Sequence, residues 1–169
     1  MGSALIDYTP PEAIAEYKDS NDMNAVRQIQ TAILDTYSAD FGKYRRSVPQ
    51  LKLERVFDYA SQTPCQKVRY SEISKEEQSR ELKGAIDLLE RARVLTRVFH
   101  TNYIATPLKN GINEKVFKFI FLDVGLAHAS KNLSLVGRLN KGKIENQQLG
   151  QMAEQFVGQH LLQRGPTYP

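Results

Sequence analysis

The segment GRLNKGKI at residues 137–144 has the spacing of a phosphate-binding P-loop. In such a loop, glycine N–H groups and a lysine surround the phosphates, and a serine or threonine hydroxyl holds Mg²⁺. Here Ile144 occupies the hydroxyl position, and an aliphatic side chain cannot ligate a hard cation. The apolar run that ends at Asp123 also precedes the loop, whereas the strand with the metal-binding aspartate follows it in P-loop enzymes. We therefore predict that the chain binds no nucleotide and uses no cofactor.

Other side chains with catalytic or metal-binding chemistry are scattered along the chain. The histidines, His100, His128 and His160, lie too far apart in sequence to have the spacing of metal ligands. Cys65 is the single cysteine, and a lone cysteine is more often a small packed residue than a nucleophile. With no internal disulfide to form, the chain suits a reducing compartment, and we expect a cytoplasmic protein. These patterns predict neither an enzyme nor a metal site.

The composition is that of a globular protein. Of the 169 residues, 41% are hydrophobic and 25% are charged, which is ordinary for a folded domain. No apolar run approaches the roughly 20 residues that a membrane span needs, and the N-terminus has no signal-peptide pattern. We expect no membrane partner.

The net charge of +4 is concentrated in one segment. Residues 43–69 contain seven basic and two acidic side chains, which is more than the excess of the whole chain. Such a cluster favours contact with nucleic-acid phosphates. The candidate nucleic-acid-binding residues are these seven and two from a following helix: Lys43, Arg45, Arg46, Lys52, Arg55, Lys67, Arg69, Arg80 and Lys83.

Apolar periodicity predicts the elements that must position these side chains. We expect helices at about 12–18, 23–41, 49–60 and 74–92, with a short extended piece at 68–70. Ser74 and Glu77 would form a capping box at the start of the fourth helix. A strand at 94–99 and a returning strand at 103–105 complete a hairpin. This order is that of a winged helix-turn-helix unit, which we place at residues 49–107.

Beyond Pro107 the pattern changes. We expect a strand at 116–122 that is apolar on both faces, a helical turn at 124–129, a polar loop at 130–147 and a helix at 148–162. The apolar side chains of the last helix, from Leu149 to Leu161, are predicted to face inward or partly so. The expected fold is mainly α, of the α+β class. Its three parts are an N-terminal helical segment 1–48, a winged helix 49–107 and an incomplete α/β segment 108–169.

Four stretches carry a family resemblance: ILDTYSADFGKY at 33–44, AIDLLERARVL at 85–95, FKFIFLDVGL at 117–126 and GQMAEQFV at 150–157. In order and spacing they resemble the C-terminal region of a large bacterial and archaeal group of AAA-type P-loop ATPases, over nearly the whole chain. The resemblance implies an N-terminal ATPase, a winged-helix middle and a C-terminal PD-(D/E)xK nuclease-like domain of unknown function. The chain lacks the first part and holds the beginning of the third.

The same resemblance implies that the nuclease-like metal site is incomplete. Glu154 matches the acidic residue on the first helix of that domain. The family's remaining metal carboxylates and its lysine would follow Pro169. A two-carboxylate metal site cannot form from Glu154 alone. We therefore expect neither ATP hydrolysis nor nucleic-acid cleavage.

Two functions stay open at this point. Residues 75–93 contain five basic and five acidic side chains, and this neutral helix favours a non-catalytic module that docks on the missing ATPase domain or another protein. The alternative is weak, nonspecific DNA binding by the winged helix through the basic patch at 43–69. Because the segment 112–162 would lack its family partners, we also predict self-association, or an aggregation-prone tail, through that segment.

Overall fold

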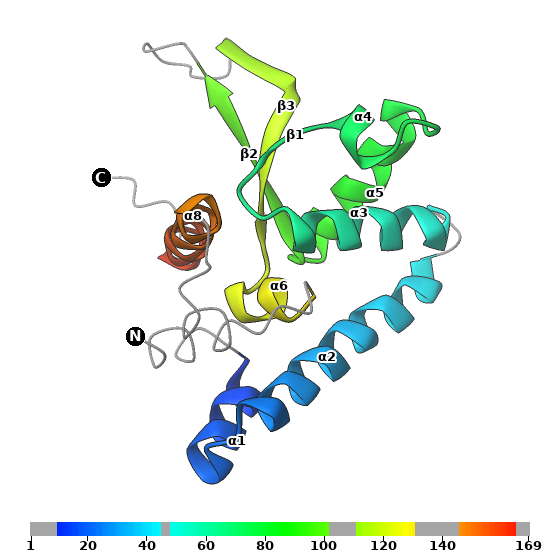
Figure 1. The fold of residues 1–169 in the computed structure, drawn as a ribbon. Coiled ribbons are helices and arrows are strands. Elements are labelled where there is room, and N and C mark those ends of the chain that lie inside the picture. The colour runs from blue at the N-terminus through cyan, green and yellow to red at the C-terminus, as the bar shows by residue number, and fades with distance from the viewer. Residues whose placement is uncertain (1–9, 45–47, 102–110, 131–145, 165–169) are drawn as a thin grey trace.

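A computed structural model describes residues 10–44, 48–101, 111–130 and 146–164, and its fold is the predicted mainly helical α+β type (Figure 1). No helix within these ranges has the length and hydropathy that a bilayer span requires. The elements are α1 (Pro11–Ser20), α2 (Met23–Asp40), the 3₁₀ helix η2 (Phe41–Tyr44), α3 (Gln50–Gln62), β1 (Lys67–Arg69), α4 (Tyr70–Ile73), α5 (Ser79–Arg91), β2 (Leu95–Thr101), β3 (Ile112–Phe121), α6 (Val124–Ser130) and α8 (Asn146–Arg164).

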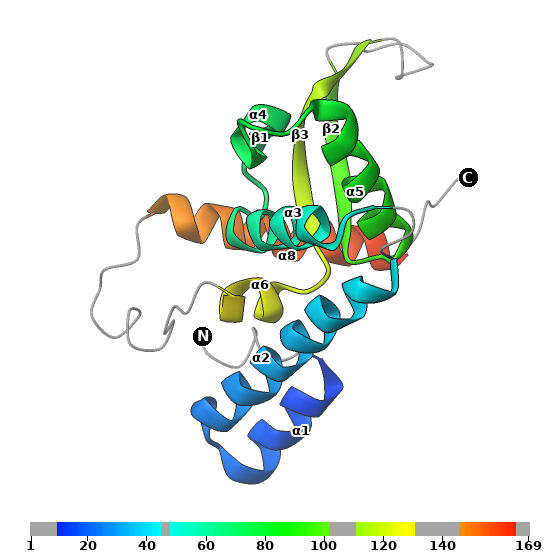
Figure 2. The same ribbon diagram turned by 90° about the vertical axis from the view of Figure 1, so that its right-hand side faces the viewer.

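Helices α1 and α2 pack against each other as a hairpin that points away from the sheet in both views (Figures 1 and 2). We call α1–α2 the arm. Asn21 ends α1 in the left-handed conformation, and the carboxylate of Asp22 caps α2 by accepting the N–H of Asn24 at 2.8 Å. The two helices predicted here are confirmed. Helix α2 ends at Asp40, close to the predicted end at 41, and the 3₁₀ helix η2 continues the chain to Tyr44.

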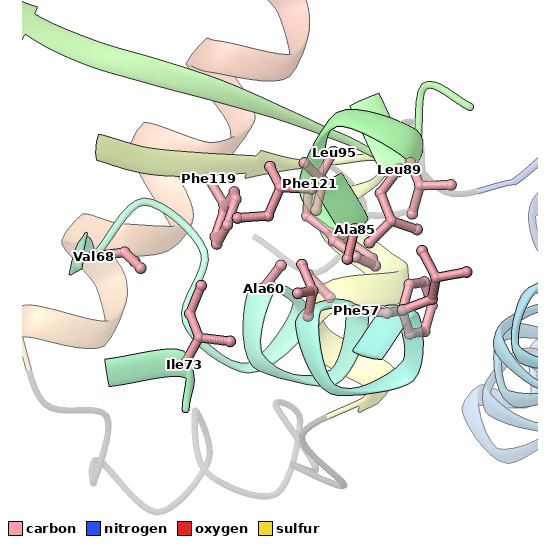
Figure 3. Packing of buried hydrophobic residues seen from close by; sticks show 14 of the residues in the cluster. Phe57, Ala60, Val68, Ile73, Ala85, Leu89, Leu95, Phe119 and Phe121 are labelled. Atoms are coloured by element: carbon pink, nitrogen blue, oxygen red, sulfur yellow. The ribbon is translucent and has the colours of Figure 1, made fainter. Parts of the chain in front are cut away.

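The sheet is antiparallel, with the strand order β1–β3–β2. Helices α3 and α5 lie on one side of the sheet, against β3 and β2, and α8 lies on the other side (Figure 1). The inner face of β3 carries Phe117, Phe119 and Phe121, each at most 1% exposed. Figure 3 shows this core, where the ring of Phe57 from α3 lies 5.4 Å from that of Phe121. Because successive side chains of β3 point to opposite faces, one face of the strand packs in the helix-covered core and the other faces α8.

Strand β3 corrects the predicted domain boundary. Its residues pair with β1 at Val68↔Phe117 and with β2 at Phe99↔Phe117, so a boundary after residue 107 would divide one sheet. The strand is apolar on both faces because core helices cover one face and α8 covers Ile120 on the other. The returning strand predicted at 103–105 lies outside the described residues.

The start of α5 also differs from the prediction. The helix begins at Ser79 rather than at Ser74. The hydroxyl of Ser74 instead accepts the N–H groups of Glu76 and Glu77, both at 3.3 Å, in the turn before the helix. The carboxylate of Glu77 is bound by Arg55 of α3 at 3.0 Å, so a long-range ion pair replaces the predicted capping box.

Candidate functional site

Among the described residues, the basic side chains predicted at 43–69 lie on three elements, η2, α3 and β1. On α3, Lys52 binds the carboxylate of Glu81 at 2.5 Å, and Arg55 binds that of Glu77. Both carboxylates come from α5 or the turn before it. These two cations therefore tie α3 to the neighbouring helix, and their charge is compensated inside the molecule.

The remaining predicted cations are spread over several surfaces. Lys67 and Arg69 are exposed on β1, on the sheet face opposite the buried Val68. Arg80 is exposed on α5, where Lys83 pairs with Glu114 of β3 at 3.3 Å. Lys43 pairs with Asp40 at 2.6 Å, and Arg45 and Arg46 lie outside the described residues. The structure thus separates the predicted set onto the two sides of the sheet.

Arg97 of β2 is an important cation that sequence reasoning missed. Its guanidinium contacts the carboxylates of Asp87 and Glu90, which lie one turn apart on α5. Burial would lower the pKa of Arg97, but the hydrogen bonds and charges of Glu90 and Asp87 outweigh it and raise the pKa. The acidic side chains of α5 are therefore held by cations from α3 and β2.

A second cluster of polar side chains lies where β3 ends. Asp123 is 7% exposed, and its Oδ1 accepts the N–H of Leu126 at 2.8 Å in the first turn of α6. Gln159 of α8 accepts the N–H of Val124 at 3.0 Å and also bonds to Asp123. Burial raises the pKa of the Asp123 carboxyl to about 6, although its hydrogen bonds oppose the rise.

Gln155 completes this cluster. Its side chain is fully buried, and its amide oxygen accepts the N–H of Phe121 at 2.9 Å. Its amide nitrogen donates to the carbonyl of the same residue at 2.7 Å. The amide thus pairs with the end of β3 as a neighbouring strand would. We call the polar cluster of Asp123, Gln155 and Gln159 the joint, because it fastens α8 to β3 and α6.

Cys65 lies beside the joint and is buried, as the sequence predicted. Its Sγ is 3.9 Å from the amide oxygen of Gln155. Burial and then the nearby charge of Glu154 raise the pKa of the thiol to about 12. The thiolate is therefore not populated near neutral pH, and Cys65 is a packing residue in this fold.

A cavity of about 550 Å³ opens between the arm and the joint. Its polar lining comes from Glu12, Tyr37, Asp123, Gln159 and Gln163. Burial, and then the charge of Asp123, raise the pKa of Tyr37. Among the described residues, no group of three His, Cys, Asp or Glu side chains is placed to hold a metal ion. The polar groups of the joint bond to backbone groups and to one another, and they thereby hold α6 and α8 in place. None of the three side chains of the joint is an activated nucleophile.

Two further predicted sites can be placed. Glu154 is exposed on α8, where it pairs with Lys118 of β3 across the sheet face. This ion pair attaches α8 to the sheet. The P-loop-like segment at 137–144 lies outside the described residues.

Comparison with protein families identifies the larger part of the chain. Residues 10–136 match the family described as a domain of unknown function, DUF8612, and the chain belongs to that family. The matched range contains the arm, the sheet and α6, whereas α8 follows it. The comparisons with curated proteins and with solved structures give no match.

Proposed function

We propose that this member of the DUF8612 family is a non-catalytic docking module of an AAA-type ATPase, built on a winged helix. The element order α3–β1–α4–α5–β2–β3 and the strand order β1–β3–β2 fit a winged helix. In that reading α5 is the second helix of the motif and the β2–β3 hairpin is the wing. The ATPase as partner rests on the four sequence stretches that resemble that group.

The observation that carries this proposal is the position of α6. This helix contacts α2 of the arm, α3 of the sheet unit and α8, and its N-terminus is the joint at Asp123. A displacement of the arm would therefore act on α8 through one packed and hydrogen-bonded connection. Energetic coupling between distant sites needs such a contiguous network. A relay from a partner at the arm to α8 fits this geometry.

The ion pairs made by the predicted cations support a protein partner over a nucleic-acid partner. Four of the predicted cations, Lys43, Lys52, Arg55 and Lys83, form ion pairs within the molecule. Each would have to leave a carboxylate in order to bind a phosphate. The arm is acidic, since residues 11–40 contain six acidic and two basic side chains. We infer that the arm docks on a basic surface of the ATPase.

The test is calorimetric titration of the chain with the AAA-type ATPase domain encoded nearest to its gene. We expect saturable binding that differs between the ATP and ADP states of that domain. Asp19→Lys with Asp35→Lys, both at exposed arm positions, should weaken the affinity. Glu76→Lys reverses an exposed charge before α5 and is the matched control. Absence of saturable heat in both nucleotide states would refute the proposal.

Nucleic-acid binding is the second candidate, and the uneven charge of the molecule favours it. Residues 50–101 and 111–121 contain twelve basic and nine acidic side chains, and this basic part lies away from the acidic arm (Figure 1). Arg80 and Arg91 are exposed on α5, a helix that contacts α3, α4 and β2. A surface of this kind would bind phosphates weakly, with Kd of about 10⁻⁴ to 10⁻⁶ M at physiological salt.

Fluorescence anisotropy with a labelled DNA duplex tests this second candidate. Arg80→Ala with Arg91→Ala should weaken binding and reduce the salt slope by about one for each lost contact. Lys52→Ala is the matched control, because Lys52 already binds Glu81. An unchanged anisotropy throughout the nonspecific range would exclude this function without affecting the docking proposal.

A further inference from the structure

Helix α8 presents its polar side to the protein. Gln151, Gln155, Gln159 and Gln163 recur every fourth residue and therefore share one face. Gln155 is 0% exposed and Gln159 is 7% exposed. Gln151 accepts a hydrogen bond from Gln66 at 3.1 Å, and Gln163 lines the cavity. The face of α8 that meets the fold is thus held by side-chain amides.

The opposite side of α8 is apolar and faces water. Leu149, Val157 and Leu161 are 44%, 54% and 62% exposed, and Ala153 between them is also exposed. We call these four residues the outer stripe. A surface helix normally buries its apolar stripe and exposes its polar one. The sequence-based prediction that these side chains face inward, or partly so, is therefore wrong for all four residues of the outer stripe.

The helix cannot turn to bury this stripe without losing its fit to the sheet. A Cβ atom on Gly158 would lie 2.5 Å from Cδ1 of Ile120, so α8 and β3 approach closely at the glycine. Rotation would also break both hydrogen bonds between Gln155 and Phe121. The outer stripe is therefore fixed in its outward position.

We propose that the outer stripe binds the same stripe of a second copy of this chain, in a two-fold symmetric dimer. Rows of side chains spaced four apart on two helices interdigitate at a crossing angle of about −50°. Ala153 within the row allows close approach. Self-pairing is not opposed by charge, because the charged side chains of α8 are Glu154, which is paired with Lys118, and Arg164 at its end.

The size of the stripe sets the strength expected of this dimer. Four apolar residues on one helix form a patch of a few hundred Å², whereas a stable interface buries about 800 Å² on each partner. The dimer should therefore dissociate in the micromolar to millimolar range. The outer stripe includes no residue of the arm or of α5, so loss of the dimer and loss of ATPase or nucleic-acid binding can be told apart.

Sedimentation equilibrium of the full chain between about 10 µM and 1 mM, where a small interface dissociates, is the first test. We expect a monomer–dimer equilibrium whose Kd rises about tenfold or more in Val157→Asp and in Leu161→Asp. Val157→Gln, a milder change, should act in the same direction with unchanged helical circular dichroism. Leu51→Asp, at a 63% exposed site on α3, is the control and should leave the Kd unchanged.

Chemical cross-linking locates the interface independently. In Val157→Cys the new thiol is exposed, whereas the native Cys65 is buried and unreactive. A short bismaleimide should link two copies of this variant and should not link copies of Asp19→Cys, which carries its thiol on the arm. A monomer at every concentration would overturn the proposal. So would a dimer insensitive to Val157→Asp and Leu161→Asp, or a Val157→Cys variant that does not cross-link.

Discussion

Asp123 makes the stability of the joint depend on pH. Its carboxyl has an ordinary pKa of 3.8 in the unfolded chain, and burial raises the pKa to about 6 in the folded chain. A group whose pKa rises on folding binds its proton more tightly in the folded state. Its contribution to stability is therefore complete below about pH 4 and is lost as the pH rises through about 6.

The substitution Asp123→Asn isolates this contribution. Asparagine keeps an oxygen that can accept the N–H of Leu126, and it is a good helix cap, but it does not ionise. One pKa unit corresponds to about 1.4 kcal/mol, so the displacement from 3.8 to about 6 amounts to about 3 kcal/mol. The amide can lose the hydrogen bond with Gln159, at a cost of about 1 kcal/mol that does not change with pH.

The assay is urea unfolding of both proteins at intervals between about pH 4 and pH 8. The free energy of unfolding of the wild type should fall, relative to the variant, by up to about 3 kcal/mol across this range. Asp35→Asn is the control, because Asp35 is exposed on α2 and lies outside the joint, so the same change of side chain should alter the pH profile little. Parallel pH profiles for wild type and Asp123→Asn would refute the reasoning, since they would mean that Asp123 titrates alike in both states.

Three further substitutions test the packing around the joint and the sheet. Gln155→Leu should lower the free energy of unfolding by about 2–4 kcal/mol in urea melts, because it leaves two buried backbone groups of Phe121 unpaired. The control Gln163→Leu, at an exposed site on the same helix, should change the free energy of unfolding little. Arg97→Met should cost about 1–2 kcal/mol by thermal unfolding, because two partly exposed carboxylates lose their shared cation. Gly158→Ala should cost about 1–3 kcal/mol by overpacking Ile120, and the cost should shrink in an Ile120→Val background.

The sequence predicts the helical elements well because their signals are local. On α3 the apolar side chains Leu53, Val56, Phe57 and Ala60 follow helical spacing, and each is at most 3% exposed. The arm is equally clear, because Asp22 is a capping residue at the start of a periodic stretch. In these cases the pattern that forms the helix also identifies its buried face.

The sheet is harder to predict because strand pairing is a long-range property. Strand β3 begins with exposed Asn113, Glu114 and Lys115, so its apolar alternation appears only near Val116. No local sequence pattern indicates that β3 pairs with β2. The ion pairs have the same character, since Lys52 and Glu81 lie far apart in sequence. The basic cluster counted along residues 43–69 therefore includes cations that the fold places on different elements.

The orientation of α8 depends on the free-energy cost of leaving the buried backbone N–H and C=O of Phe121 unpaired. At Phe121 the strand has run past its partner β1, which pairs with β3 at residues 116–118. An apolar side chain at position 155 would contribute about 1.5–3 kcal/mol by burial. It would also orphan the N–H and C=O of Phe121, at about 1–3 kcal/mol each. The glutamine satisfies both groups at once, and the four-residue repeat then places its apolar neighbours outward. The exposed stripe on α8 is thus a consequence of how β3 ends, and it leaves the apolar surface on which a second copy can bind.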